Sequence, residues 1–198
     1  MKFISFSAQR FDEDAANPYT PSAYSWPSTF TIEQETELKA EIQRLLTLLG
    51  MRTSIYNIET RIGTNGKLYI MEVSPRGGGN RLSEMLHFST GVDLITNAVR
   101  AAVGDEVVGI EQKPYNGHWA EIILHAGKAG HFVGLDINKD FYETHVFQTD
   151  LWVKEGDKVS SFNGANDAIG TLVLKFDSEK ELVYTLAHQT DYINVVIK

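Results

Sequence analysis

The segment from residue 56 to residue 79 constrains the fold of this chain more than any other. Two stretches of alternating apolar and polar residues flank Asn65-Gly66, a strong short-range pattern for a β-hairpin. With a two-residue loop at Asn65-Gly66, Glu59 lies directly opposite Glu72. Directly opposed like charges destabilise a pair of strands, because their Cβ atoms are only about 4.5–5.5 Å apart. A cation between or above the carboxylates would offset that repulsion, and oxygen ligands suit a hard ion such as Mg²⁺.

The same pairing gives the hairpin two different faces. Asn57 is paired with Ser74, so both lie on the face that carries the two glutamates. The opposite face is apolar and is expected to be buried; it carries Ile58, Ile62, Tyr69, Met71 and Val73. The segment therefore predicts a ribbon with one buried side and one acidic side. The alternative is that the two glutamates are simply solvated side chains on an exposed sheet.

The acidic face continues beyond the second strand. Arg76 follows Ser74 at a spacing of two, and Pro75 between them cannot donate to a strand ladder, so the chain leaves the sheet there. Arg76 is placed to bind a carboxylate or another anion near the metal, or to pair with one of the glutamates. The three glycines at 77–79 allow close backbone approach to a ligand just before a helix begins, although a flexible turn is the simpler interpretation.

Composition excludes several classes of function. The chain has 198 residues and no cysteine, so disulfides, thiolate zinc sites and cysteine nucleophiles are excluded. The formal net charge of −8, with no cluster of basic residues, argues against nucleic-acid binding. No apolar run approaches the roughly 20 residues that span a bilayer, and the first residues become polar too soon for a signal peptide. We therefore expect a cytoplasmic protein with no membrane partner.

Local patterns place the elements of the first half. Residues 2–7 predict a strand and residues 10–30 an ordered loop. Thr31 and Gln34 form a capping box, so a helix is expected from there to about Leu49. After the hairpin, residues 80–88 and 92–103 predict two helical segments, separated at a glycine.

From residue 119 the pattern becomes richer in strands. Strands are expected at residues 119–125, 131–137, 170–176 and 193–197, with a helix at residues 178–188. These elements predict an α+β fold with two parts: residues 1–110, and a smaller β-rich part at residues 111–198. None of the six histidines has a zinc-site spacing, and a structural role is expected for each.

The hairpin and the glycines after it resemble the closing strands of the ATP-grasp fold. The resemblance rests on the motif Asn57-x-Glu59-x-Arg61, then Asn65-Gly66-Lys67-x-Tyr69-x-x-Glu72-Val73-Ser74-Pro75-Arg76-Gly77-Gly78-Gly79. ATP-grasp enzymes join a carboxylate to an amine or thiol through an acyl-phosphate. The run from Glu72 to Arg76 is similar to that of the formate-dependent glycinamide ribonucleotide transformylase branch, in which serine also replaces the usual asparagine. Residues after 109 resemble the small β-rich appendage of biotin carboxylases and amino-acid ligases.

The resemblance implies roles for particular residues. It assigns Glu59, Glu72 and Ser74 to Mg²⁺ or Mn²⁺, and Arg76 to orienting the carboxylate or acyl-phosphate. It assigns nucleotide and acceptor contacts to the following residues: Asn57, Glu59, Glu72, Gly77, Gly78, Gly79 and Arg81. The implied cofactors are ATP and a divalent ion, and the implied substrates are a small carboxylate and an amine.

The resemblance covers the C-terminal half of an ATP-grasp enzyme. The family's substrate domain, and the subdomain whose two lysines and glycine-rich lid hold the phosphates, have no counterpart in this sequence. We therefore expect the isolated chain to bind Mg-ATP weakly or not at all, and to be inactive without a separate N-terminal half. Two other interpretations stay open. One is a non-catalytic interaction or regulatory module; the other is a metal-dependent hydrolase that uses the two glutamates. The candidate protein partners are a separate N-terminal half or further copies of the same chain.

Overall fold

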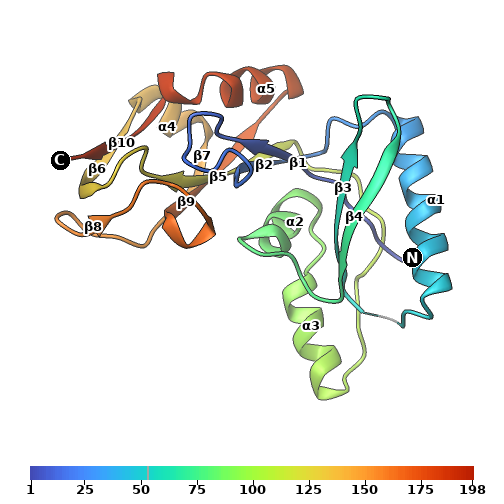
Figure 1. The fold of residues 1–198 in the computed structure, drawn as a ribbon. Coiled ribbons are helices and arrows are strands. Elements are labelled where there is room, and N and C mark those ends of the chain that lie inside the picture. Colours follow the sequence, from blue (N-terminus) through green and yellow to red (C-terminus); the bar gives the residue numbers. More distant parts are fainter. Residues whose placement is uncertain (53) are drawn as a thin grey trace. The chain divides into compact units, whose positions relative to one another are not determined.

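The protein consists of two compact units in a computed structural model that describes residues 1–52 and 54–198 (Figure 1). Unit 1 comprises Met1–Phe6 and Ser28–Asn116. Unit 2 comprises Ser7–Pro27 and Gly117–Lys198. The expected boundary near residue 110 had placed all of the first 110 residues together. The structure differs there, because residues 7–27 belong to unit 2.

Strand pairing explains why this early segment joins unit 2. The segment forms two strands, β1 (Ala8–Phe11) and β2 (Pro21–Trp26), and β2 pairs with β5 (His118–His125). The expectation of a loop over residues 10–30 is therefore corrected. Such pairing between distant segments leaves no trace in the local sequence pattern. The strand expected at residues 2–7 does not form either, and these residues belong to no helix or strand.

The described residues of unit 1 form three helices and one hairpin. The first helix, α1 (Ile32–Leu48), begins at the expected capping box: Thr31 Oγ1 accepts from the amide of Gln34, and Gln34 Oε1 accepts from the amide of Thr31. The other elements are β3 (Asn57–Ile62), β4 (Leu68–Ser74), α2 (Leu82–Thr90) and α3 (Leu94–Val103). Helices α2 and α3 end at Gly91 and Gly104, which both have positive φ.

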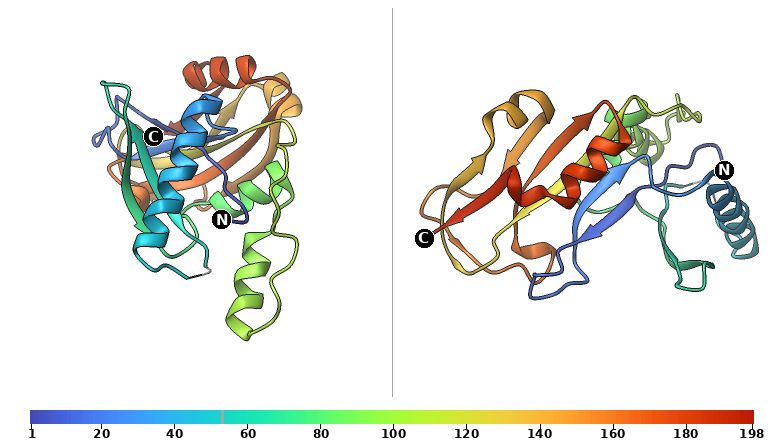
Figure 2. Two further views of the ribbon diagram at one scale, coloured as in Figure 1. Left: turned by 90° about the vertical axis from the view of Figure 1, so that its right-hand side faces the viewer. Right: turned by 90° about the horizontal axis from the view of Figure 1, so that it is seen from above.

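The core of unit 1 lies between α1 and the hairpin. Leu38, Ile42 and Leu46 from α1 are buried with Phe6. Apolar side chains of the hairpin pack against this cluster: Ile58, Leu68, Ile70 and Val73. Two views show α1 running alongside the hairpin (Figures 1 and 2). The helix thus holds one face of β3 and β4 and leaves the opposite face open.

The turn of the hairpin differs from the expected two-residue loop. The amide of Gly63 donates to the carbonyl of Lys67 at 2.8 Å, and the amide of Gly66 donates to the carbonyl of Gly63 at 2.9 Å. Three residues, Thr64 to Gly66, therefore close the hairpin, with Gly66 at φ 73°. The pairing next to the turn is shifted by one residue, so that Ile62 lies opposite Leu68.

Unit 2 is built on two antiparallel sheets. The larger sheet has the strand order β1-β2-β5-β9-β7, and the smaller has the order β10-β6-β8. The remaining elements of this unit are β6 (Gly130–Ile137), α4 (Lys139–His145), β7 (Val146–Leu151), β8 (Lys158–Val159), η1 (Ala165–Asp167), β9 (Ala168–Phe176), α5 (Glu179–Ala187), η2 (Gln189–Asp191) and β10 (Ile193–Ile197). Figure 2 shows α5 lying across the larger sheet.

The elements expected after residue 119 are confirmed at β5, β6, β9, α5 and β10, within a residue or two at each end. Ser178 caps α5 by accepting from the amide of Glu181 at 3.3 Å. Helix α4 and strand β7 were not expected. The amide of Phe141 donates to Asn138 Oδ1, so Asn138 is the N-cap of α4.

The α+β fold class is confirmed, with antiparallel sheets and flanking helices. None of the helices in the described part of the chain combines the length and the apolar character that a membrane span needs.

Candidate functional site

The predicted pairing of the carboxylates is present in the hairpin. Glu59 lies opposite Glu72, and Asn57 lies opposite Ser74. The turn and the strand pairing that produce this register differ from those expected. The turn shifts the pairing by one residue, and an irregularity between Glu59 and Thr60 shifts it back, which leaves Met71 without a partner residue as a β-bulge.

The bulge also changes which apolar residues are buried. Ile58 and Val73 pack on α1 as expected, but Met71, Tyr69 and Ile62 are exposed. Leu68 and Ile70 take their places in the core. The expected core face is thus corrected for β4 between the turn and the bulge, because the bulge reverses the alternation at Met71. Ile62 lies on the unbulged strand opposite Leu68, and it is exposed at the end of β3 next to the turn.

Each of the facing carboxylates has a polar partner on its own strand. Glu59 Oε1 is 2.6 Å from an Nη atom of Arg61, and both side chains are partly exposed. The hydroxyl of Ser74 donates to Glu72. Arg61 therefore offsets part of the like-charge repulsion, while the pair stays on the solvent side of the hairpin. This geometry keeps carboxylate oxygens accessible to a cation.

Arg76 lies where the chain leaves the sheet. Its backbone amide donates to the carbonyl of Ser74 at 2.9 Å, and its guanidinium donates to the carbonyl of Gly77 at 2.8 Å. The side chain is exposed. Its charge therefore lies just beyond the end of β4 that carries the acidic face.

The three glycines have different environments. A Cβ atom on Gly78 would lie 2.3 Å from Leu82 Cδ1, 3.0 Å from Leu82 Cβ and 3.0 Å from Asn57 Oδ1. On Gly77 it would lie 3.3 Å from Ser83 Oγ, and on Gly79 it would meet nothing within 4 Å. Gly78 is thus required for close packing of this turn against the first turn of α2. That packing also places the amide of Asn57 beside the glycines.

Arg81 occupies the N-cap position of α2 and is bound to a neighbouring carboxylate. Its Nε and Nη2 atoms donate to the two oxygens of Glu84 at 2.7 and 2.6 Å. The side chain is mostly buried. A ligand contact by Arg81 would therefore require that this two-pronged ion pair open or be shared.

The donor set on the acidic face fits a hard divalent cation. Two carboxylates, one hydroxyl and one amide oxygen lie on the same face, at Glu59, Glu72, Ser74 and Asn57. The part of the chain that the structure describes contains no group of three or more histidine, cysteine, aspartate or glutamate residues around a common point. The described site therefore offers two carboxylates. Proteins commonly bind Mg²⁺ through one or two carboxylates, while phosphate groups of the substrate and water supply the other ligands.

Sequence reasoning missed two polar features of unit 2. Glu121 is fully buried on β5, within an otherwise apolar strand. His125 Nε2 is 3.0 Å from Asp12 Oδ2, and the imidazole stacks on Phe162 with ring centroids 4.0 Å apart. For Glu121, the sequence did contain a signal, because it is a charged residue within a run of apolar residues that was expected to form a strand. The partner of His125 comes from a segment more than a hundred residues away.

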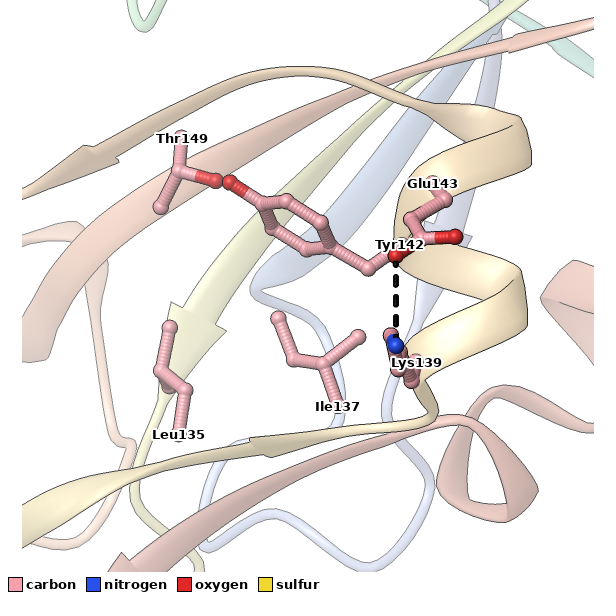
Figure 3. A pocket seen from close by; sticks show the side chains of 6 residues that line it. All are labelled: Leu135, Ile137, Lys139, Tyr142, Glu143 and Thr149. Carbon is pink, nitrogen blue, oxygen red and sulfur yellow. Dashed lines mark ion pairs between the residues drawn. The ribbon is translucent and has the colours of Figure 1, made fainter.

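Two shallow hollows on unit 2 contain none of the predicted site residues. One, of about 390 Å³, is lined by Leu135, Ile137, Lys139, Tyr142, Glu143 and Thr149. Figure 3 shows the hydroxyl of Tyr142 pointing toward Thr149, with the ion pair of Lys139 and Glu143 at the side. The other, of about 540 Å³, lies along α5.

Comparisons with known proteins identify the fold. No protein-family model and no curated protein matches the chain. Among solved structures, phosphoribosylglycinamide synthetase from Anaerococcus prevotii is 18% identical with a TM-score of 0.80, and the match covers 99% of this chain and 50% of that one. L-amino acid ligase from Bacillus licheniformis is 16% identical with a TM-score of 0.76, covering 97% of this chain and 51% of that one.

A third structure was determined with ligands. The biotin carboxylase domain dimer of 2-oxoglutarate carboxylase from Hydrogenobacter thermophilus, in complex with MgADP, ADP and bicarbonate, is 17% identical with a TM-score of 0.67. The match covers 93% of this chain and 41% of that one. The chain thus spans about half the length of the structures that it matches. It has the ATP-grasp fold of these enzymes over that length.

Proposed function

We propose that this chain is the C-terminal half of an ATP-grasp ligase, which activates a carboxylate with Mg-ATP as an acyl-phosphate and transfers the acyl group to an amine. The observation that carries the proposal is the pair of facing carboxylates on the open side of the β3–β4 hairpin. Such a pair destabilises an ordinary strand ribbon, and a bound divalent ion offsets the repulsion. In this proposal residues 1–110, apart from the segment 7–27 that joins unit 2, supply half of the ATP-grasp core, and residues 111–198 supply the small appendage.

The residues on and next to the acidic face would have different roles in binding the ion, the carboxylate and the acceptor. Glu59, Glu72 and Ser74 would hold the ion, with Asn57 beside them. When bound, a divalent ion neutralises charge on the phosphate oxygens. Arg76, just beyond the acidic face, would bind the carboxylate or the acyl-phosphate, because a guanidinium can donate two parallel hydrogen bonds to such a group. The backbone of Gly77 to Gly79 would allow the acceptor to approach closely.

Arg61 has a specific part in this scheme. Its ion pair with Glu59 balances one of the two charges while no cation is present. A divalent ion would compete with the guanidinium for the Glu59 carboxylate. Glu72 forms no ion pair with the residues that the structure describes, and its carboxylate accepts a hydrogen bond from the hydroxyl of Ser74. Glu72 is therefore expected to contribute more than Glu59 to cation affinity.

Cation binding by the full chain tests the site directly. Mn²⁺ is the probe, titrated calorimetrically and followed by its paramagnetic resonance signal. We expect the wild type to bind one Mn²⁺ weakly and Glu72→Gln to weaken binding by about tenfold or more. Glu143→Gln is the matched control, because Glu143 is an exposed carboxylate on unit 2. Equal binding by the wild type and both variants would contradict the proposed site.

Activity requires groups that this chain does not supply. Phosphoryl transfer depends on positioning and on neutralising the charge of the phosphates. The lysines and the lid that perform this task in the family have no counterpart in the sequence. We therefore expect the isolated chain to show no ATP turnover and weak Mg-ATP binding. Micromolar affinity for Mg-ATP, measured by calorimetry on the chain alone, would contradict this part of the proposal.

A non-catalytic module is the second candidate. The chain matches its solved relatives over about half of their length at 16–18% identity, and a match of this kind supports a shared fold without supporting a shared reaction. The two candidates differ in what lies next to the gene. An adjacent reading frame that encodes the two lysines and the lid, and that restores turnover when its product is added, supports the ligase. A product that binds the chain without turnover supports the module.

A further inference from the structure

Arginine side chains flank the two facing carboxylates along the open face of the hairpin. Glu59 and Arg61 are two residues apart on β3, so their side chains leave the strand on the same side. At the other end of the face, Arg76 follows Ser74 where the chain leaves β4. The order along this face is therefore one arginine, then the acidic pair with its neighbouring amide and hydroxyl groups, and then a second arginine.

The two arginines differ in what their guanidinium groups contact. Arg61 has one Nη atom 2.6 Å from Glu59 Oε1, and its other Nη atom donates to the carbonyl of Thr60 at 3.1 Å. Arg76 donates to the carbonyl of Gly77, and none of the ion pairs in the described part of the chain includes it. The side chains of Arg61 and Glu59 are 40% and 37% exposed, so solutes can reach both groups. Arg61 is therefore the arginine whose contacts a bound cation would change.

The charges of this face balance while no cation is bound. Glu59 and Glu72 carry two negative charges, and Arg61 and Arg76 carry two positive charges. The remaining charged residue of the hairpin, Lys67, is exposed beside the turn. A divalent ion adds two positive charges to the balanced face. An anion with two negative charges therefore complements the face that holds an ion, and it does not complement the empty face.

On the basis of the cation site proposed above, we propose that Arg61 exchanges partners when the ion binds: its guanidinium leaves Glu59 and binds a phosphoryl oxyanion that is coordinated to the same ion. The ion takes the Glu59 carboxylate because, at the same distance, a divalent charge attracts a carboxylate more strongly than a guanidinium does. The released guanidinium stays beside the ion, since its own strand holds it there. It can then donate two parallel hydrogen bonds to the phosphoryl group.

This exchange couples the binding of the two ligands. Without an anion, the ion must break the ion pair of Arg61 and then lies next to a positive charge that has lost its carboxylate partner. With an anion present, the guanidinium gains a new partner, so the same ion binds more tightly. Linkage requires that the ion tighten anion binding by the same factor. Arg61 thus opposes the cation alone and favours the cation together with the anion.

The class of anion follows from charge and from the geometry of the guanidinium. A phosphoryl group carries nearly two negative charges at neutral pH and has several acceptor oxygens. It can therefore ligate the ion with one oxygen and accept from the arginine with others. A carboxylate has one charge and two oxygens, so it would leave the face with an excess positive charge.

Titration of the full chain with Mn²⁺, in chloride and in sulfate at equal ionic strength, measures the coupling through the paramagnetic resonance signal of free Mn²⁺. Sulfate is the probe because it is a tetrahedral dianion. In chloride, we expect Arg61→Gln to bind Mn²⁺ about twofold to fivefold more tightly than the wild type, because the competing ion pair is gone. Sulfate should tighten binding by the wild type about fivefold, and by Arg61→Gln less than about twofold.

Arg44→Gln is the matched control, because Arg44 is also an exposed arginine paired with a carboxylate, Glu41, and it lies on α1. Both of its Mn²⁺ affinities should stay within about twofold of those of the wild type. Equal tightening by sulfate in the wild type and Arg61→Gln would overturn the exchange, as would an unchanged affinity of Arg61→Gln in chloride. The cation site itself would then still stand on its dependence on Glu72. A wild type that binds no Mn²⁺ would overturn both proposals.

A second variant keeps the test decisive if Arg61→Gln fails to fold. Arg61→Lys keeps the positive charge but lacks the planar pair of donors. Its Mn²⁺ affinity in chloride should be within about twofold of the wild type, and the effect of sulfate should fall below about twofold. Full coupling to sulfate in Arg61→Lys would overturn the assignment of paired hydrogen bonds to the arginine.

ADP and acetyl phosphate distinguish the two sources of a phosphoryl group in the proposed reaction. Each is titrated into the wild type and Arg61→Gln at constant Mn²⁺, after correction for the Mn²⁺ that the compound binds in solution. A larger loss of affinity for ADP in the variant assigns Arg61 to the nucleotide, and a larger loss for acetyl phosphate assigns it to the acyl-phosphate. Equal affinities of the two proteins for both compounds would overturn the phosphoryl assignment.

Discussion

Replacement of Gly78 by alanine tests how closely the glycine turn packs against α2. The new methyl group would lie 3.0 Å from Leu82 Cβ, which the helix backbone holds in place, and 3.0 Å from Asn57 Oδ1. The contacts with Leu82 Cδ1 at 2.3 Å and with Asn57 Oδ1 can be relieved by rotation of those side chains, but the contact with Leu82 Cβ requires movement of the glycine turn or of α2. Overpacking of this kind costs about 1–3 kcal/mol. We therefore expect Gly78→Ala to lower the free energy of unfolding of unit 1 by that amount.

Gly79→Ala provides the matched control one residue away. A Cβ atom there meets nothing within 4 Å, and its φ lies outside the left-handed region. Its effect should be within about 0.5 kcal/mol, or slightly stabilising through the reduced entropy of the unfolded chain. Urea unfolding followed by circular dichroism gives both values, and hydrogen exchange at residues 80–91 shows whether the change is local to α2. A Gly78→Ala variant as stable as Gly79→Ala would refute the close-approach argument.

Two further predictions concern helix caps. Thr31→Ala removes one half of the capping box of α1 and should cost about 1 kcal/mol of unfolding free energy, while Thr31→Ser should cost less; thermal unfolding compares them. Hydrogen bonds from the hydroxyl and amide of Thr96 hold the pKa of Asp93, the N-cap of α3, below its usual value. The stability that this charge contributes is present above about pH 4, the ordinary value for an unfolded aspartate, and is lost as pH falls through the lowered pKa. The advantage of the wild type over Asp93→Asn in urea midpoint should therefore shrink below about pH 4, and an advantage that is independent of pH would exclude this origin.

Local sequence patterns account for most of the elements. The capping residues Thr31 and Ser178 mark the starts of α1 and α5, and the glycines at 91 and 104 end α2 and α3, because these signals act within a few residues. The pairing of Glu59 with Glu72 was predicted correctly but from a two-residue loop that does not form, because the shift at the turn and the bulge at Met71 cancel each other.

The features that were missed depend on distant residues or on the exact turn. Strand β2 forms because β5, almost a hundred residues later, offers it a partner. The contact of Asp12 with His125 arises in the same way. Within the hairpin, Asn65-Gly66 suggested a two-residue loop, but the hydrogen bonds of Gly63 select a three-residue loop with only Gly66 at positive φ. Asparagine is compatible with both turns, so the residue types alone do not decide between them.

The bulge at Met71 places Glu72 on the acidic face although the three-residue turn shifts the strand pairing by one residue. Without it, strict alternation would place Glu72 on the same face as Leu68 and Ile70, against α1. Deletion of Met71, which is 64% exposed, would leave a regular strand in which Leu68, Ile70 and Val73 still face the core and Glu72 still lies opposite Glu59. We therefore expect this deletion to change stability by less than about 1 kcal/mol and to retain Mn²⁺ binding. Deletion of Thr60 from the unbulged strand is the control, because it would move Glu59 onto the face toward α1 and bury an unpaired charge. If the two deletions prove equally harmful in urea unfolding, the bulge does not set the register as argued.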